Sequence, residues 1–314
     1  MSTFAERERE CERLFQQSGP FWHLYTDGSS MADFLCTEEE FNSAMIALAV
    51  VTVVFAKVRI ITFELMSNHI HLILNGRKED CLELFDRFKL RIRKILRRKG
   101  RIMDWDQFKA DLLLIESLNT LRNEIIYVNR NGFVVNTRYT PFSYPWGGGC
   151  AYFSPIINQL PVKSLKELGF NRSREITHFR EIRAIDALSF VNNVVFIPSF
   201  CRIDIGEGMF RNARSYFNSL TRNSEAFSQI AQRLKDSVFL TDEEMYAVAV
   251  MYAEKTFGNK RLPILSPEQK IQLSKELYFK YNASNQQIRR ILKLDINILN
   301  ELFPQQSSAP TSAK

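Results

Sequence analysis

Along the first 135 residues, short runs of β-branched and aromatic residues alternate with longer stretches in which apolar residues recur every three or four positions. The short runs are typical of strands and the longer repeats of helices. Strands are predicted at 21–28, 58–66, 69–74 and 111–115. Helices are predicted at 37–56, 79–99 and 116–131. Only Ser67 and Asn68 separate the second and third strands, which predicts an antiparallel hairpin. The pattern therefore predicts an α+β fold, in which helices flank an antiparallel sheet of four or five strands.

Beyond residue 136 the alternation ends. The segment 137–150 contains two prolines and three consecutive glycines, which exclude a regular element there. We therefore expect the first domain to span 20–150. A mostly helical region of unknown role is predicted at 160–260.

A further helical unit is predicted at 262–303. Ser266 to Gln269 has the form of a capping box with proline at the first helical position. A turn from Asn282 to Ser284 then precedes a helix that carries Arg289 and Arg290, an order similar to a helix-turn-helix. Those arginines would face a DNA groove, although a small bundle with no DNA role fits equally well. The tail 304–314 has few apolar residues and is expected to be disordered.

Composition narrows the class of protein. With 45% hydrophobic residues in 314, the chain can fill a core, which excludes wholesale disorder. The balance of 42 Lys+Arg against 35 Asp+Glu gives a net charge of +7, which suggests a polyanionic partner. Five widely spaced cysteines without a C-x-x-C pattern indicate neither a disulfide framework nor a cysteine zinc site. The most apolar stretch, 44–56, is too short to cross a membrane. We expect a cytoplasmic protein with no membrane partner.

Two of the four histidines stand as His69-Ile70-His71. Side chains alternate faces along a strand, so His69 and His71 point the same way while Ile70 points into the core. Two imidazoles on one face can both bind a divalent metal ion. The alternative is a pair of polar residues on a solvated strand face.

The surrounding residues favour the metal site. The stretch LMSNHIHLIL (65–74) resembles the strand–turn–strand of the single-tyrosine HUH transposases, which include insertion-sequence and REP-associated tyrosine transposases. Tyr127 and Asn131 match the family's tyrosine and the polar ligand that follows it by four residues. Four residues put both on one helix face, roughly 6 Å apart. Ser67 and Gly132 stand where the family has prolines; we expect Gly132 to end the helix, as glycine commonly does. The resemblance covers about residues 20–150.

The resemblance implies a ferredoxin-like catalytic domain that nicks and rejoins single-stranded or hairpin DNA during DNA transposition and recombination. Tyr127 would form a 5′-phosphotyrosine intermediate and release a 3′-hydroxyl. His69, His71 and Asn131 would hold a divalent metal ion, and this mixed donor set suits magnesium or manganese. Some members of the family act as homodimers and others as monomers.

Two alternative functions stay open, and in both of them Tyr127 has no catalytic role. In the segment IIYV, Tyr127 is more commonly a packing residue than a nucleophile, and other tyrosines lie near in the sequence. The protein would then be either a non-catalytic nucleic-acid-binding regulator that kept the fold or a metal-dependent nuclease that uses water.

The helix at 79–99 supplies the strongest basic segment. Nine basic residues and no acid lie between Arg87 and Arg101. Such a run is either a solvated helix face or a phosphate-binding surface. The residues predicted to contact DNA are Arg87, Arg91, Arg93, Lys94, Arg97 and Arg98. Aromatic residues of the 139–153 segment, Trp146 among them, would stack on unpaired bases or cap the core.

Overall fold

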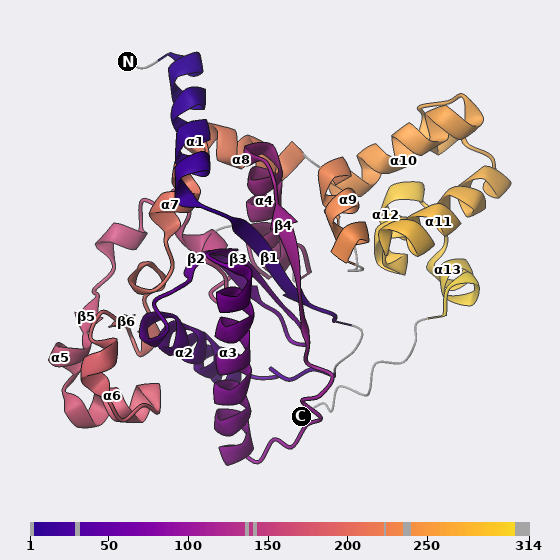
Figure 1. Ribbon diagram of the computed structural model, residues 1–314. Helices are drawn as coiled ribbons and strands as arrows, with labels where there is room; N and C mark the ends of the chain where they lie inside the picture. The colour runs from indigo at the N-terminus through magenta and orange to yellow at the C-terminus, as the bar shows by residue number, and fades with distance from the viewer. Residues whose placement is uncertain are drawn as a thin grey trace. The chain divides into compact units, whose positions relative to one another are not determined.

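The computed structural model describes residues 3–28, 32–135, 138–140, 143–222, 224–234 and 240–304 (Figure 1). The chain divides into two compact units, Met1–Asn223 and Ser224–Lys314. The predicted region 160–260 is therefore shared between the two units. Among the described helices, none combines the length and the apolar character needed to cross a lipid bilayer.

A four-stranded antiparallel sheet forms the centre of the first unit. Its strands are β1 (Phe21–Thr26), β2 (Arg59–Leu65), β3 (Ile70–Asn75) and β4 (Ala110–Ile115), in the order β2-β3-β1-β4. The hairpin of β2 and β3 is present, and its turn is closed by a hydrogen bond from the Met66 amide to the His69 carbonyl oxygen (2.9 Å). The predicted α+β class is thus confirmed, with the H-x-H segment at the start of a central strand.

Helices cover both faces of this sheet. Ile70, Leu72 and Leu74 of β3 are fully buried on one face, where α2 (Glu38–Val54) and α3 (Lys78–Arg98) pack against each other and the sheet (Figure 1). His71 and Ile73 point to the other face, which α4 (Leu118–Val135) covers. Thr37 caps the start of α2 with a capping box. The helix α1 (Phe4–Ser18) also packs against α4.

One expectation is corrected here. The helix α4 runs through Gly132 to Val135 instead of ending at residue 131. The segment after residue 160 is mostly helical, as expected, and it also contains a small three-stranded sheet, formed by β5 (Lys163–Ser164), β6 (Ser189–Val191) and β7 (Val194–Val195). Asn192 and Asn193 join β6 to β7 with φ of 48° and 69°, the backbone that a tight two-residue hairpin turn requires. The remaining helices of this unit are α5 (Leu165–Leu168), α6 (Phe170–Thr177), α7 (Ile203–Gly208) and α8 (Ala213–Arg222).

The second unit is helical. It contains α9 (Ser224–Leu234), α10 (Asp242–Phe257), α11 (Pro267–Tyr281), α12 (Asn285–Leu292) and α13 (Ile296–Leu302). The predicted capping box at Ser266 begins α11, and a second capping box, at Ser284, begins α12. Met245, Leu277, Ile288 and Leu299 belong to one buried core, so α10 packs with α11, α12 and α13, which form the helical unit predicted at 262–303. The tail was predicted to be disordered, and its residues 305–314 lie outside the described part of the chain.

Candidate active site

Three imidazoles and a phenol meet between the sheet and α4. The ring centroid of His71 lies 5.0 Å from that of His69, 5.2 Å from that of His23 and 5.7 Å from that of Tyr127. His23 comes from β1, and its centroid is 6.2 Å from that of Tyr127. The structure therefore brings together His69, His71 and Tyr127, which the sequence predicted, and adds His23.

The helix α4 presents its polar residues to the sheet at helical spacing. Glu124, Tyr127 and Asn131 follow one another at intervals of three and four residues, which places them on one face of the helix. Asn131 is buried one turn beyond Tyr127. The neighbouring Asn129 fixes the helix, since it accepts a hydrogen bond from Thr62 of β2 and donates one to the Tyr216 hydroxyl (2.9 Å). The position of Tyr127 along the sheet is thus set by buried hydrogen bonds.

A buried hydrogen-bond chain leads from α4 to His71. Oε2 of Glu124 lies 2.7 Å from Nδ1 of His23, and Nε2 of His23 lies 3.0 Å from Nδ1 of His71. Glu124, His23 and His71 are all at most 1% exposed. Hydrogen bonds in such a water-poor environment are stronger than those at a surface. Sequence reasoning missed Glu124 and His23 because neither belongs to a local motif with His71.

His69 is supported separately by the residue before it. Nδ1 of His69 lies 2.7 Å from Oδ1 of Asn68, and Nδ2 of Asn68 donates to the Gly28 carbonyl oxygen (2.7 Å). A side chain on Gly28 would contact both Asn68 and His69 closely. The turn between β2 and β3 and the chain after β1 therefore hold the His69 ring jointly.

The two predicted ligands have a suitable spacing for one metal ion. Suppose that two imidazoles bind one ion through Nε2, with N–metal distances of about 2.1 Å and an N–metal–N angle of roughly 90°. Their ring centroids then lie roughly 5 Å apart. The measured separation of His69 and His71 is 5.0 Å, with the ring planes at 87°. Within the part of the chain that the structure describes, no group of three or more His, Cys, Asp and Glu side chains is arranged to hold a metal. The predicted set of His69, His71 and Asn131 contains only two residues of those types.

Glu64 is a second buried acid on the same face of the sheet. It pairs across the strands with His71, and it is 1% exposed. Burial raises the pKa of the Glu64 carboxyl well above its usual range, and the backbone amide of Gly132 beside it opposes this shift only in part. Nothing in the sequence pattern of β2 distinguishes Glu64 from a solvent-facing acid.

The aromatic segment after α4 is engaged mainly in packing. The Trp146 ring stacks on Phe41 with centroids 4.4 Å apart, and its Nε1 donates to Oδ1 of Asn42 (2.8 Å). The Tyr144 hydroxyl donates to the Leu65 carbonyl oxygen (2.6 Å). These contacts favour the core-capping alternative for both residues. Contact of Trp146 with DNA stays a prediction, and Tyr139, which is only half-buried, is the more accessible ring beside it.

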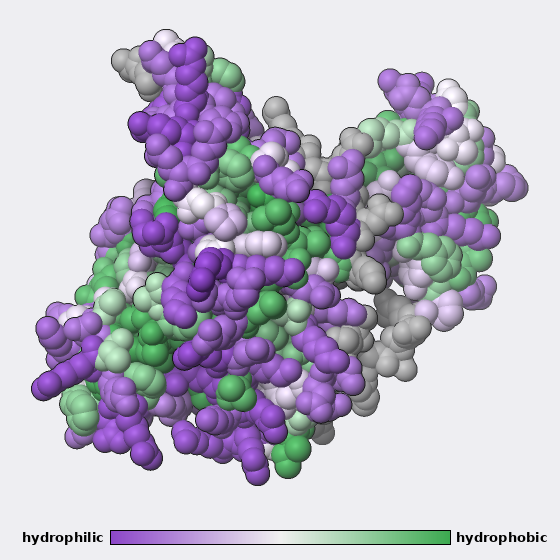
Figure 2. Space-filling model, in the orientation of Figure 1, coloured by the Kyte–Doolittle hydropathy of each residue, from purple (hydrophilic) through white to green (hydrophobic). Residues whose placement is uncertain are grey.

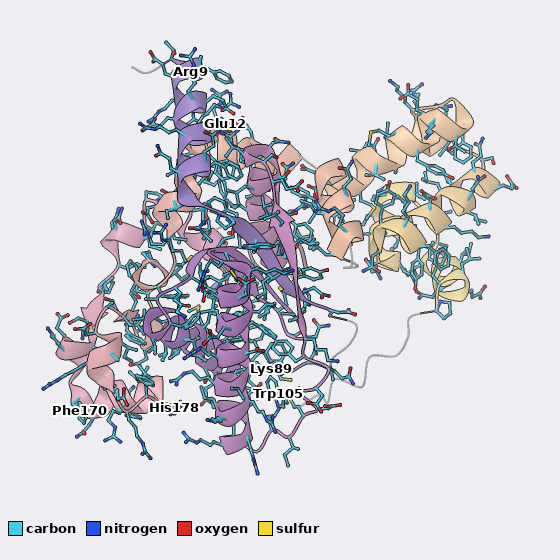
Figure 3. All side chains as sticks on the ribbon, viewed as in Figure 1. Arg9, Glu12, Lys89, Trp105, Phe170 and His178 are labelled. Atoms are coloured by element: carbon cyan, nitrogen blue, oxygen red, sulfur yellow. The ribbon has the colours of Figure 1, made fainter. Side chains whose placement is uncertain are left out.

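The basic run on α3 separates into two groups. The first group is engaged in contacts within the protein. Arg87 forms an ion pair with Glu83, and Arg91 donates a hydrogen bond to the Thr177 carbonyl oxygen. Lys89, which lies near Trp105, donates a hydrogen bond to the Phe108 carbonyl oxygen (Figure 3). By contrast, four exposed cations form no ion pair with another described residue: Arg93, Lys94, Arg97 and Arg98. The side of the unit on which α3 lies is largely hydrophilic in Figure 2. Because α3 and α4 cover opposite faces of the sheet, this group lies on the other side of the sheet from Tyr127.

On α12 the two predicted arginines differ. Arg290 forms a two-point ion pair with Asp242 of α10, with Nε 2.5 Å from Oδ2 and Nη2 2.9 Å from Oδ1. Arg289 is exposed. Of these two arginines, only Arg289 could therefore contact a DNA groove without the loss of an internal ion pair.

Compared with protein-family models, with curated proteins and with solved structures, the chain gives no match. The assignment of a function therefore depends on the residues themselves.

Proposed function

We propose that the protein is a metal-dependent DNA strand-transfer enzyme of the single-tyrosine HUH type, with Tyr127 as its nucleophile. The observation that carries the proposal is the meeting of His69, His71 and Tyr127 on one face of the sheet, from segments more than 50 residues apart. The substrate would be single-stranded DNA, which the net charge of +7 and the exposed cations of α3 would attract. The protein would act on this substrate in the cytoplasm.

The reaction suits a tyrosine. The Tyr127 oxygen would attack the phosphorus of a phosphodiester, so that an Oη–P bond forms and the bond to the 3′-oxygen breaks. The phenol proton is lost to solvent, and the departing oxygen takes up a proton as a 3′-hydroxyl. A 3′-hydroxyl of another strand can later attack the phosphotyrosine and regenerate the phenol, because the aryl ester retains the energy of the broken bond. Joining therefore requires no ATP.

Nε2 of His69, Nε2 of His71 and the amide oxygen of Asn131 would hold a magnesium or manganese ion. Such an ion neutralises charge on the attacked phosphate and orients it. A phenol with a pKa of about 10 is about 0.1% ionised at neutral pH, so the attack needs this assistance.

One observation favours a second candidate. Tyr127 is 3% exposed, so its phenol must become accessible when DNA binds. If it stays buried, the same two histidines would instead serve a nuclease in which water attacks the phosphate. That reaction releases a free 5′-phosphate and no protein-linked DNA.

The test is covalent capture. A single-stranded hairpin oligonucleotide labelled at its 3′ end is incubated with the protein and Mn²⁺, and protein-linked label is measured on a denaturing gel. We expect an adduct with the unmodified protein and a loss of roughly a thousandfold or more in Tyr127→Phe, which removes the nucleophile. The matched control is Tyr25→Phe, since the Tyr25 ring lies 5.9 Å from His23 on the same face. An undiminished adduct in Tyr127→Phe would refute the assignment, and free 5′-phosphate without an adduct would establish the nuclease.

A further inference from the structure

We propose that Glu124 and His23 are positioning residues that hold His71 in the tautomer whose Nε2 binds the metal ion, and that Asn68 does the same for His69. This inference rests on the proposed function, because it assigns a role to residues that support its metal ligands. Two of these residues, Glu124 and His23, belong to no sequence motif.

The chain of donors starts at Glu124. A carboxylate only accepts hydrogen bonds, so the proton in the 2.7 Å contact belongs to Nδ1 of His23. A neutral imidazole with a proton on Nδ1 has its lone pair on Nε2. Nε2 of His23 therefore accepts, and Nδ1 of His71, 3.0 Å away, donates. The remaining lone pair of His71 then lies on Nε2.

The same argument applies to His69 through another partner. The Asn68 amide nitrogen is committed to the Gly28 carbonyl oxygen, so its oxygen faces His69. An amide oxygen only accepts, which assigns the proton to Nδ1 of His69 and the lone pair to Nε2. Both predicted ligands thus use Nδ1 for support and keep Nε2 for coordination.

Burial makes the arrangement rigid. His23 is 0% exposed and Glu124 is 1% exposed, so neither can exchange its partner for water without a rearrangement. Partners of this kind, which donate to or accept from a metal-bound imidazole, set its orientation and its basicity, and their loss costs about 10–100-fold in metal affinity.

A purely structural role makes a different prediction. If His23 were an imidazolium that only joins β1 to α4 through Glu124, its Nε2 would donate to His71. His71 would then carry its proton on Nε2, where it could not bind a metal. The two roles therefore place the proton of His71 on different nitrogens.

The first test is made on the metal-free protein. Selective ¹⁵N labelling of its four histidines reports which ring nitrogen carries the proton. We expect the Nδ1–H tautomer for both His69 and His71. An Nε2–H tautomer at His71 would overturn the proposal, whether or not any variant folds.

The second test is Mn²⁺ affinity, measured by calorimetric titration. We expect His23→Phe, which keeps the bulk but removes both hydrogen bonds, to weaken binding by about 10–100-fold. His23→Gln can accept from His71 and donate to Glu124, so it should recover most of that loss. The control is Trp22→Phe, which removes a hydrogen bond from β1 to the Gly76 carbonyl oxygen without touching the chain to His71.

The outcomes separate this inference from the proposed function. The positioning role would be overturned if His23→Phe and the unmodified protein bind Mn²⁺ with equal affinity. It would also be overturned if the unmodified protein does not bind Mn²⁺. The expected affinities together with an absent DNA adduct would keep the positioning role and refute the strand-transfer activity.

Discussion

The carboxyl group of Glu64 fills the space that a side chain on Gly132 would need. A methyl group added to Gly132 would overlap Oε1 of Glu64 and the ring of Tyr144. Glu64 pairs with His71 across β2 and β3, so this contact lies beside the candidate site. Glycine at position 132 therefore allows α4 to approach β2 closely, and the helix continues through it.

We expect Gly132→Ala to destabilise the protein by about 1–3 kcal/mol, because overlap in a packed interior forces neighbouring groups to move. In an unobstructed helix the same substitution would stabilise by about 1 kcal/mol. Urea unfolding measures the difference in the free energy of unfolding between Gly132→Ala and the unmodified protein. In a Glu64→Ala background the cost should be smaller, and an equal cost in both backgrounds would show that Glu64 is not the obstacle.

The sequence allowed the main elements of the first unit to be predicted, because their apolar periods are long and clear. The hairpin, the H-x-H segment and the helix carrying Tyr127 all follow from local patterns. The partners of His71 do not. His23 pairs with Ile73 and is thereby a diagonal neighbour of His71, but only the register of β1 against β3 establishes this. That register depends on tertiary packing between segments 48 residues apart.

The features that the sequence pattern does not reveal have similar physical causes. The strands β5 and β7 are two residues long, too short to show a period of two. Gly132 was expected to end α4, as a glycine beyond the last turn commonly does. Its real constraint is the close approach of Glu64, a contact across 68 residues that no local pattern encodes.

Thiol reactivity should distinguish the cysteines. Burial raises the pKa of the Cys81 and Cys150 thiols to about 12, whereas Cys36 is exposed. Since the thiolate is the reactive form, a pKa of 12 leaves about 0.01% thiolate at pH 8, rising about tenfold per pH unit. We expect iodoacetamide at pH 8 to modify Cys36 alone among these three, as read by mass spectrometry of peptides. Cys36→Ser should abolish the fast labelling; rapid modification of Cys81 in the folded protein would contradict its burial.

The ion pair of Arg290 and Asp242 should stabilise the second unit in a pH-dependent way. The hydrogen bond from Arg290 lowers the pKa of Asp242 below its usual value of 3.8. A carboxyl whose pKa is lower in the folded state adds stability at neutral pH and loses it as the pH falls through the folded value. Both side chains are about half exposed, so we expect Arg290→Ala to cost no more than about 1 kcal/mol at pH 7. Thermal unfolding should show that this difference disappears below the folded pKa of Asp242, and a difference unchanged in acid would contradict it.

Arg289 provides the matched test of DNA binding by α12. It is exposed, so Arg289→Ala should leave thermal stability within about 0.5 kcal/mol of the unmodified protein. If α12 enters a groove, the same variant should weaken DNA binding and reduce its salt dependence. Fluorescence anisotropy with a labelled duplex measures the affinity and its salt dependence. Unchanged affinity in Arg289→Ala would favour the small bundle with no DNA role.

The exposed cations of α3 should contribute to DNA affinity more than its paired cations do. The four without ion pairs to other described residues are Arg93, Lys94, Arg97 and Arg98. Replacing all four by glutamine should weaken the binding of single-stranded DNA. The negative slope of log affinity against log salt should also become less steep, by about 0.7 for each phosphate that is no longer neutralised. Arg87→Gln is the control, since Arg87 is already neutralised by Glu83. Because α3 and Tyr127 lie on opposite faces of the sheet, adduct yield at saturating DNA should be unchanged in the fourfold variant. An unaltered salt slope would show that this face of α3 is only solvated.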